Sequence, residues 1–381
     1  MADASSTPPL PGPPEPMWPL LAALAEPALS ASYDESHWDR VIPLARSARL
    51  LGVLAVRVLD SVDRAVLPGR VQRHLDAGLI EARFRRQKTL HLLHTITPIL
   101  EGHAGPWVLL KGAAYIAQDL PFAHGRLPAD VDLMVPRTSL DGIERALLTA
   151  GWEFEKNEAY DQHYYRAWSH ELPPMVAAGQ AMELDLHHAI LPPVGRIRPD
   201  TARLFADAAP VAGSRFHVLC PHDQVLHAIV HLVHDSDFVG RLRDLLDVDA
   251  LFRRVPLSDR VARAALVERA RLHGMKKPLH LAAHLCGTWF GTPGCDALIA
   301  EDAGVASGLY GQSIVALANR VLGPTNGQDG AARSRRTAAL LLEARSHWLR
   351  MPPSLLAYHA ASKGMRSLAQ LATKRERTAE G

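Results

Sequence analysis

The segments Leu110-Lys111-Gly112-Ala113-Ala114 and Asp130-Val131-Asp132-Leu133-Met134-Val135 decide the fold of this chain. The apolar run over residues 107–110 stops at a Lys-Gly pair, which predicts a buried strand that enters a turn. Apolar and acidic residues alternate over residues 130–135, so we expect a second strand with both aspartates on one face. A short helix over residues 113–118 would connect the two strands, and the three elements together predict the start of an α/β unit.

A third strand repeats the alternation of acidic and apolar residues. In Met182–Leu186 and the residue that follows, Glu183, Asp185 and His187 share one face. If this strand lies beside the strand of residues 130–135, Asp185 completes a triad of carboxylates with the two aspartates there. Carboxylate oxygens are hard ligands that suit Mg²⁺, which commonly binds one or two carboxylates and the phosphates of a substrate.

The turn after the first strand has the features of a phosphate-binding element. Gly112 follows a strand and opens a helix, so free backbone N–H groups and a positive helix end are available there. Lys111 and Arg126 are cations close to this turn in the sequence. A D-x-D pair or a glycine after a strand is common on its own. The combination of both with the later strand that contains Asp185 favours a functional site over chance.

Helical patterns lie on both sides of these strands. Apolar residues recur at helical spacing from residue 37 to about 102, and strands and helices alternate between about 105 and 190. In the second region we expect Thr138 or Ser139 to cap a helix that ends at Gly151, and further strands at Phe154 and Tyr160–Trp168. From Cys220 onward the pattern is helical again, over Val225–Val233, Leu242–Phe252, Val261–Leu272, Leu279–Leu285, Ile314–Leu322 and Ala338–Leu349.

These patterns predict an α+β fold, with a small mixed sheet, flanking helices, and largely helical N- and C-terminal regions. The expected division of the chain is a Pro-rich disordered tail over 1–16, an N-terminal helical region over 17–104, an α/β core over 105–200, a C-terminal helical domain over 201–360 and a basic tail over 361–381. Residues 323–330 (GPTNGQDG) have the composition of a loop.

The composition excludes several classes of protein. Hydrophobic residues make up 48% and charged residues 22% of the 381 residues, unlike a disordered chain, a collagen or a disulfide scaffold. The net charge of +2 provides no global attraction to nucleic acid or anionic lipid. Three cysteines without a C-x-x-C pair favour a reducing compartment, so we expect a cytoplasmic protein. No uncharged apolar run approaches the ~20 residues that span a bilayer.

The order LLKGAA, GR-x-x-x-DVDLMV and ELDLHH resembles the DNA polymerase β-like nucleotidyltransferase superfamily. It is most similar to the uncharacterised bacterial nucleotidyltransferases, which have an L-K-G turn, an R-x-x-x-D-I-D-L-L-V strand and a D-L-H strand. The resemblance covers about residues 35–255. Its D-x-D strand is the most specific motif, the third aspartate is less specific, and the flanking helices are the least specific.

The resemblance implies Mg²⁺-dependent transfer of NMP from an NTP to a hydroxyl group, with Mn²⁺ as the alternative metal. Asp130, Asp132 and Asp185 would bind two metal ions. Gly112 and Ala113 would cradle the triphosphate through their backbone N–H groups, and Lys111 and Arg126 would neutralise phosphate charge. The superfamily more often has Gly-Ser or Gly-Gly at this turn, so Ala113 removes a hydroxyl that would help to hold phosphate.

The histidines allow a different interpretation. His227, His231 and His234 share one helix face, and the pair His234-Asp235 is similar to the motif of HD phosphohydrolases. The nucleotidyltransferases resembled here also have a His-containing helix, which is followed by an R-L-R-x-x-x-D-like helix that Arg241–Asp247 matches. We therefore favour histidines that pack beside the sheet, with His231 and His187 as candidates for substrate contact, over an independent metal centre.

Three functions remain open at this point. The first is an NTP-dependent and Mg²⁺-dependent nucleotidyltransferase whose acceptor is a small molecule, a peptide or protein, or an RNA end. The near-neutral charge and the few aromatic residues around the motif make nucleic acid the less favoured acceptor. The second is a nucleotide-binding or regulatory module of the same fold without catalysis, and the third is an HD-type metal phosphohydrolase. The sequence says little about the oligomeric state.

Overall fold

A computed structural model describes residues 12–234, 238–301, 309–324 and 332–358. Four expectations fall partly or wholly outside these ranges. They concern the first eleven residues of the Pro-rich tail, most of the loop at 323–330, Asp235 of the His-Asp pair, and the basic tail over 361–381.

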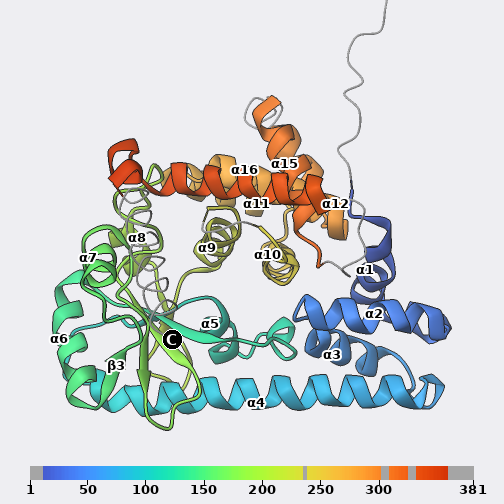
Figure 1. Ribbon diagram of the computed structural model, residues 1–381, viewed down its shortest axis with the longest axis horizontal. Helices are drawn as coiled ribbons and strands as arrows, with labels where there is room; N and C mark the ends of the chain where they lie inside the picture. The colour runs from blue at the N-terminus through green and yellow to red at the C-terminus, as the bar shows by residue number, and fades with distance from the viewer. Residues whose placement is uncertain (1–11, 235–237, 302–308, 325–331, 359–381) are drawn as a thin grey trace, which may run out of the picture.

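The N-terminal part of the chain is helical, as predicted. Its longest helix, α4, has 32 residues and is therefore about 48 Å long. In Figure 1, α4 runs along the base of the molecule, below α2 and α3 at one end and below the sheet at the other. The helices and 3₁₀ turns before the sheet are η1 (Glu15–Met17), α1 (Trp18–Ala25), η2 (Pro27–Ser32), α2 (Glu35–Ser47), α3 (Leu51–Ser61), η3 (Arg64–Val66) and α4 (Gly69–Leu100).

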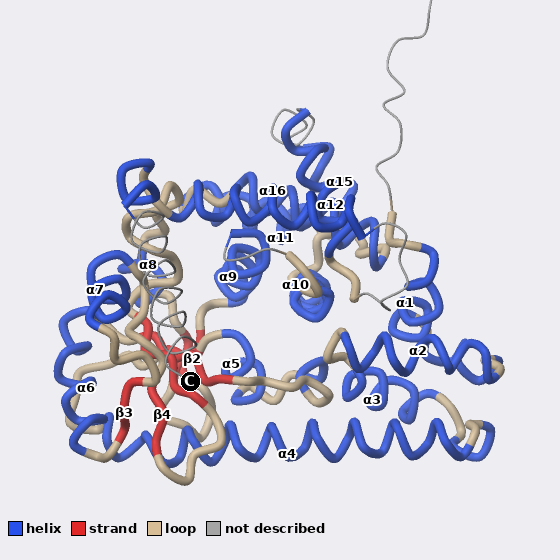
Figure 2. Tube along the Cα trace, in the orientation of Figure 1, coloured by secondary structure: helices blue, strands red, loops and turns tan. Residues whose placement is uncertain are grey.

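A seven-stranded mixed sheet gathers at one side of the molecule (Figure 2). The strand order is β3-β4-β5-β2-β1-β7-β6, in which β1 is antiparallel to β2, and β2 is parallel to β5. The sheet and its flanking helices confirm the predicted α+β fold. The strands are β1 (Val108–Leu109), β2 (Asp130–Met134), β3 (Trp152–Phe154), β4 (Met175–Ala177), β5 (Glu183–His187), β6 (Ala209–Pro210) and β7 (His217–Val218).

The pairing of β2 with β5 brings distant acidic residues side by side. The register aligns Asp132 with Asp185, and Asp130 with Glu183. Because aligned residues of parallel strands project to the same face, the acidic positions of both strands lie on one face. The intervening residues Val131 and Leu133 are completely buried. The two strands are therefore anchored by apolar contacts on one face and are free to carry charge on the other.

The helices between the strands differ in three places from the sequence expectations. The segment predicted as a strand at Tyr160–Trp168 is helical, because the aromatic residues lie at i, i+4 and i+8, and Tyr164 packs edge to face against Trp168. The helix after β2 begins directly after Pro136, so neither Thr138 nor Ser139 is its cap. The helix after β1 begins at Lys111, two residues earlier than expected. These elements are α5 (Lys111–Ala117), η4 (Pro121–Ala123), α6 (Arg137–Thr149), α7 (Ala159–Trp168) and α8 (Thr201–Ala206).

The C-terminal part is helical, and every helix predicted there is present. In Figure 1, α9 and α10 occupy the middle of the molecule, between the sheet and the N-terminal helices below and α16 above. None of the described helices is long and apolar enough to cross a bilayer. The elements are α9 (Pro221–His234), α10 (Leu242–Arg254), α11 (Arg260–Leu272), α12 (Lys276–Phe290), α13 (Cys295–Glu301), α15 (Leu309–Val321) and α16 (Ala332–Arg350).

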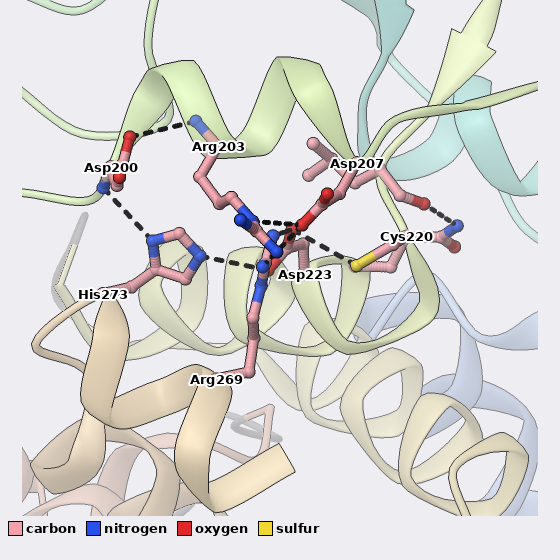
Figure 3. Close-up of polar contacts among 9 residues, drawn as sticks. Asp200, Arg203, Asp207, Cys220, Asp223, Arg269 and His273 are labelled. Carbon is pink, nitrogen blue, oxygen red and sulfur yellow. Dashed lines mark hydrogen bonds and ion pairs between the residues drawn. The ribbon is translucent and has the colours of Figure 1, made fainter. Parts of the chain in front are cut away.

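A buried ionic network ties α9 to α11 and to α8 (Figure 3). Its centre is the completely buried carboxylate of Asp223, which accepts hydrogen bonds from the Arg269 guanidinium and from the Cys220 thiol. His273 lies 3.3 Å from the same carboxylate, and Arg269 also pairs with Asp207 at 2.7 Å. Burial acts to raise the pKa of Asp223, but the hydrogen bonds from Arg269, His273 and Cys220 and the charge of Arg269 together outweigh it and leave this pKa below its ordinary value.

We predict that Asp223→Asn lowers the free energy of unfolding by about 3 kcal/mol at pH 7, since it places a neutral amide in a completely buried position and leaves the partly buried Arg269 without its main counter-charge. A carboxylate with a lowered pKa stabilises the fold above the ordinary aspartate pKa, and this contribution is lost as the pH falls through the folded-state value. The difference between the variant and the wild type should therefore shrink below about pH 4.

Chemical denaturation at pH 7 and at pH 3 measures both effects. Asp60→Asn, at an exposed position near the end of α3, is the matched control and should be neutral. A destabilisation by Asp223→Asn that is no larger than that of the control, or that does not change with pH, would contradict the role of this network.

Candidate active site

Three aspartates meet on one face of the sheet. Asp130 and Asp132 come from β2 and Asp185 comes from β5, directly beside Asp132 in the register. Asp132 is only 2% exposed, and one carboxylate oxygen of Asp185, Oδ1, is buried without a hydrogen-bond partner. A buried oxygen without a partner is costly for the fold, so its presence here points to a ligand that would supply the missing partner. The proximity of the three carboxylates is what the sequence predicted if the two strands were neighbours.

The three carboxylates differ in their electrostatic surroundings. Burial and the neighbouring charge of Asp132 raise the pKa of Asp185 to about 8, and the same two causes raise the pKa of Asp130. Burial also acts on Asp132, but the charge of Lys111 and a hydrogen bond from His187 hold its pKa well below the usual range. Asp132 is therefore the permanently ionised member, and its partners need a further cation before they ionise fully.

Lys111 supplies one cation from the turn between β1 and α5. Its Nζ lies 2.7 Å from Asp132 Oδ1. The backbone of Lys111 has a φ of 43°, which is rare for a residue with a side chain and gives the sharp change of direction into the helix. In α5 the N–H of Ala114 makes the first hydrogen bond to Leu110, so the N–H groups of Gly112 and Ala113 precede the helical pattern.

Arg126 lies against the same turn but is bound within the protein. Its Nε donates to Asp247 of α10 at 2.8 Å, and its guanidinium lies over the ring of Tyr115. A Cβ atom at Gly112 would overlap Arg126 Nη1, so a side chain here would push the end of this arginine aside. Arg126 thus lies close to the predicted phosphate-binding turn, with its charge shared with a buried carboxylate.

A second group of polar residues adjoins Asp132. His187 Nε2 lies 3.1 Å from Asp132 Oδ1 and 3.3 Å from Glu171 Oε2, and His170 Nε2 lies 3.9 Å from the same glutamate oxygen. One ligand atom from each of His170, Glu171 and His187 falls within 4.8 Å of the others, so these three residues could hold a metal ion. Burial opposes protonation of His187, but its contacts with the two carboxylates raise its pKa overall.

One histidine of α9, His227, is an electrostatic neighbour of site residues. Burial and the charges of Lys111 and His231 lower the pKa of His227 well below its ordinary value, while Asp132 acts in the opposite direction. His231 acts in turn on Asp244 of α10. His227, for which the sequence predicted no site role, thus has Lys111 and Asp132 as electrostatic neighbours, and the predicted His231 is an electrostatic neighbour of both His227 and Asp244.

A hollow of about 410 Å³ lies between α6, α7 and the end of β5. Arg137, Tyr165 and His188 are among the residues that line it. Burial raises the pKa of Tyr165, the charge of Lys156 lowers it, and the charges of Glu171 and Asp185 act in the same direction as burial. His188, which also lines the hollow, follows directly after the end of β5, the strand that contains Asp185. The sequence did not point to Tyr165 or Glu171. Tyr165 lies in Tyr160–Trp168, the segment that was wrongly predicted to be a strand, and Glu171 lies three residues after that segment.

A mixed sheet with a D-x-D strand beside a third aspartate, next to a strand–Gly–helix turn, defines a nucleotidyltransferase-type core. The chain belongs to the family of uncharacterised nucleotidyltransferases, whose profile matches residues 34–291. The match begins where the sequence resemblance predicted and extends beyond it through α12. No curated protein and no solved structure matches the chain.

The residues present fit a divalent cation. The donors are carboxylate oxygens, which suit Mg²⁺, and the buried Asp185 Oδ1 lacks a partner that a cation would supply. The neighbouring imidazoles of His170 and His187 are ligands that Mn²⁺ accepts more readily than Mg²⁺ does. The types of donor therefore suit a divalent cation, and the ligand atoms that lie within 4.8 Å of one another in the described ranges are those of His170, Glu171 and His187.

Gly112→Ala tests the packing of the turn. We predict that the variant loses about 1–3 kcal/mol of stability, because the added methyl group must displace Arg126 from Asp247. Thermal unfolding measures this loss. At Gly102 an added Cβ would meet no atom within 4 Å, so Gly102→Ala is the control and should unfold like the wild type. Equal stability of the two variants would contradict the tight approach of Arg126 to this turn.

Asp185→Asn separates a functional carboxylate from a structural one. We predict that activity falls by about 100-fold or more. A raised folded-state pKa means that ionised Asp185 destabilises the fold above the ordinary aspartate pKa, so the metal-free variant should be at least as stable as the wild type.

Unfolding with and without Mg²⁺, beside an activity assay, measures both quantities. The control is Glu153→Gln on the exposed side of β3, which should change neither. A large loss of stability in Asp185→Asn without metal would show that the carboxylate serves the fold.

Proposed function

We propose that the protein transfers NMP from an NTP to a hydroxyl group of an acceptor, with release of pyrophosphate. The observation that carries the proposal is the side-by-side placement of Asp132 and Asp185 on paired strands, with Asp185 Oδ1 buried and without a partner. Two adjacent buried carboxylates repel each other, and a bound cation removes this cost. Membership of the nucleotidyltransferase family supports the reaction class.

In this proposal each group has a stated role. Asp130, Asp132 and Asp185 hold the metal, and His187 fixes the orientation of Asp132 through its hydrogen bond. The backbone N–H groups of Gly112 and Ala113 bind phosphate oxygens. Lys111 and Arg126 offset the phosphate charge, Lys111 from beside Asp132 and Arg126 from behind Gly112. Of the two predicted substrate-contacting histidines, we assign His187 to the carboxylates and His231 to the side of α10.

When bound, Mg²⁺ or Mn²⁺ would neutralise phosphate charge and lower the pKa of the acceptor hydroxyl. The acceptor oxygen forms a bond to the α-phosphorus while the bond from this phosphorus to the bridging oxygen breaks. Pyrophosphate leaves with that electron pair, and the hydroxyl proton is released to solvent. The protein contributes chiefly by holding donor and acceptor in line. We assign the hollow beside Tyr165 to the acceptor, since His188, directly after the strand of Asp185, is among the residues that line it.

The two alternative functions have weaker support. A catalytically inactive nucleotide-binding module would not need three carboxylates at a cost to stability, and all three are kept. An HD-type hydrolase would use the His234-Asp235 pair, of which Asp235 lies outside the described residues. In the described ranges, the group of three ligand atoms found within 4.8 Å of one another comes from His170, Glu171 and His187, and none of these residues lies on α9.

The test is incubation of the protein with each α-labelled NTP, Mg²⁺ and a cell extract, followed by identification of the labelled product. We predict label on an acceptor from at least one NTP, with equal release of pyrophosphate. Asp185→Asn should reduce the label by about 100-fold or more, and Glu153→Gln should give as much label as the wild type. Binding of NTP with no label from any of the four would favour the inactive module. Stoichiometric transition metal with phosphate-ester hydrolysis would favour the HD-type hydrolase.

A further inference from the structure

Two arginines from distant parts of the chain converge on one backbone oxygen beside the site. Arg49, between α2 and α3, donates from Nη2 to the carbonyl of Leu127 at 3.1 Å. Arg243, on α10, donates from Nη1 to the same oxygen at 3.3 Å. Because both nitrogens lie within hydrogen-bond distance of one atom, two positive guanidinium groups are close neighbours. Like charges at this separation repel each other unless an anion lies between or beside them.

The carboxylates around this pair do not balance its charge. Arg243 pairs with Asp244, but Asp244 also accepts from Arg241 at 2.9 Å. Arg49 has no carboxylate within ion-pair distance in the part of the chain that the structure describes. Burial lowers the pKa of Arg49, and the charges of Arg243 and Arg85 lower it further, whereas Asp130 is the acidic residue that opposes them. The surroundings of Arg49 are thus net positive.

The arginine pair lies at the end of β2 where the carboxylates begin. Leu127 is three residues before Asp130, and the charges of Lys111, Arg126 and Arg243 all act on the Asp130 carboxylate. The positive groups are therefore electrostatic neighbours of Asp130, one of the proposed metal ligands. An anion that reached from the arginine pair to a metal ion at these carboxylates would need several negative charges along its length, as a polyphosphate has.

Close contact between two backbones holds Arg49 in this place. A Cβ atom at Gly52 would overlap the carbonyl oxygen of Gly125, and a Cβ atom at Gly125 would overlap the backbone of Gly52. The start of α3 thus packs directly on the loop that leads to Leu127. Arg49 itself has a φ of 56°, which is strained for a residue with a side chain. The chain keeps an arginine here despite this strain.

We propose that Arg49 and Arg243 form a clamp for the β- and γ-phosphates of the NTP, and hence for the pyrophosphate that leaves. The inference rests on the proposed function and assigns a binding role to the N-terminal helices. The planar guanidinium forks suit phosphate oxygens, and a diphosphate would supply the counter-charge that Arg49 lacks. The α-phosphate stays at the carboxylates, and no covalent step is added.

The experiment measures binding of pyrophosphate in the presence of Mg²⁺ by calorimetry, without turnover. Arg49→Ala is the main variant, since Arg49 makes no ion pair in the described chain and its loss should leave the fold intact, which thermal unfolding checks. Arg49→Lys keeps the charge but loses the fork. Arg46→Ala is the matched control, because Arg46 is exposed on α2 and contacts His74 at 3.0 Å.

We expect pyrophosphate to bind the wild type and Arg46→Ala equally, Arg49→Ala about 10- to 100-fold more weakly, and Arg49→Lys in between. Binding of an NMP should be unchanged in Arg49→Ala, because it lacks the β- and γ-phosphates. In the turnover assay, the KM for NTP should rise in Arg49→Ala more than kcat falls.

Several results would overturn the clamp: no binding of pyrophosphate to the wild type, equal binding by a folded Arg49→Ala, or an equal loss of NMP binding. The outcome is separable from that of the proposed function. Pyrophosphate binding that depends on Arg49 in a protein without detectable NMP transfer would support the clamp and contradict the transferase. NMP transfer with pyrophosphate binding unaffected by Arg49→Ala would support the transferase and contradict the clamp.

Discussion

The structure depends on the in-register pairing of β2 with β5, which forces the carboxylates of Asp132 and Asp185 together in a buried place. Such a pair is unfavourable, because burial removes water that would screen the charges. The protein offsets part of this cost with Lys111 and His187, which both contact Asp132. Asp185 receives no comparable partner for its buried oxygen. The charge of Asp132 is thus compensated within the protein and Asp185 Oδ1 lacks a hydrogen-bond partner, as expected where a ligand binds to Asp185.

The positive groups around these carboxylates come from all parts of the chain. Lys111 and Arg126 belong to the segment with the sheet, Arg49 comes from the N-terminal helices, and Arg243 comes from α10. The predicted division into an N-terminal helical region, a core and a C-terminal helical domain therefore does not coincide with the site, because each of the three regions contributes residues to it. The family match agrees with this, because it spans residues 34–291 and so includes all four of these positive residues.

The parts of the fold that the sequence predicted are those with local signals. The alternation in residues 130–135 predicted β2 and its two faces, and the repeat at Asp185 predicted that three carboxylates could meet. Long-range pairings have no such signal: nothing near Arg49 in the sequence indicates that it meets Leu127, and nothing near Glu171 indicates its contact with His187. The aromatic segment at Tyr160–Trp168 was predicted wrongly because strand propensity and helical spacing coincide there, and the helical contacts of Tyr164 and Trp168 decided the outcome.

The contact between Gly52 and Gly125 has a consequence for how this sequence can change over time. A side chain on either glycine would overlap the backbone of the other. Because every residue has this backbone, no substitution at one position can make room for a side chain at the other. The two positions are therefore fixed by geometry rather than by chemistry. In an alignment of related chains they should remain glycine even where the helices around them have drifted, and a chain that lost one of them should also have lost the reason to keep an arginine at position 49.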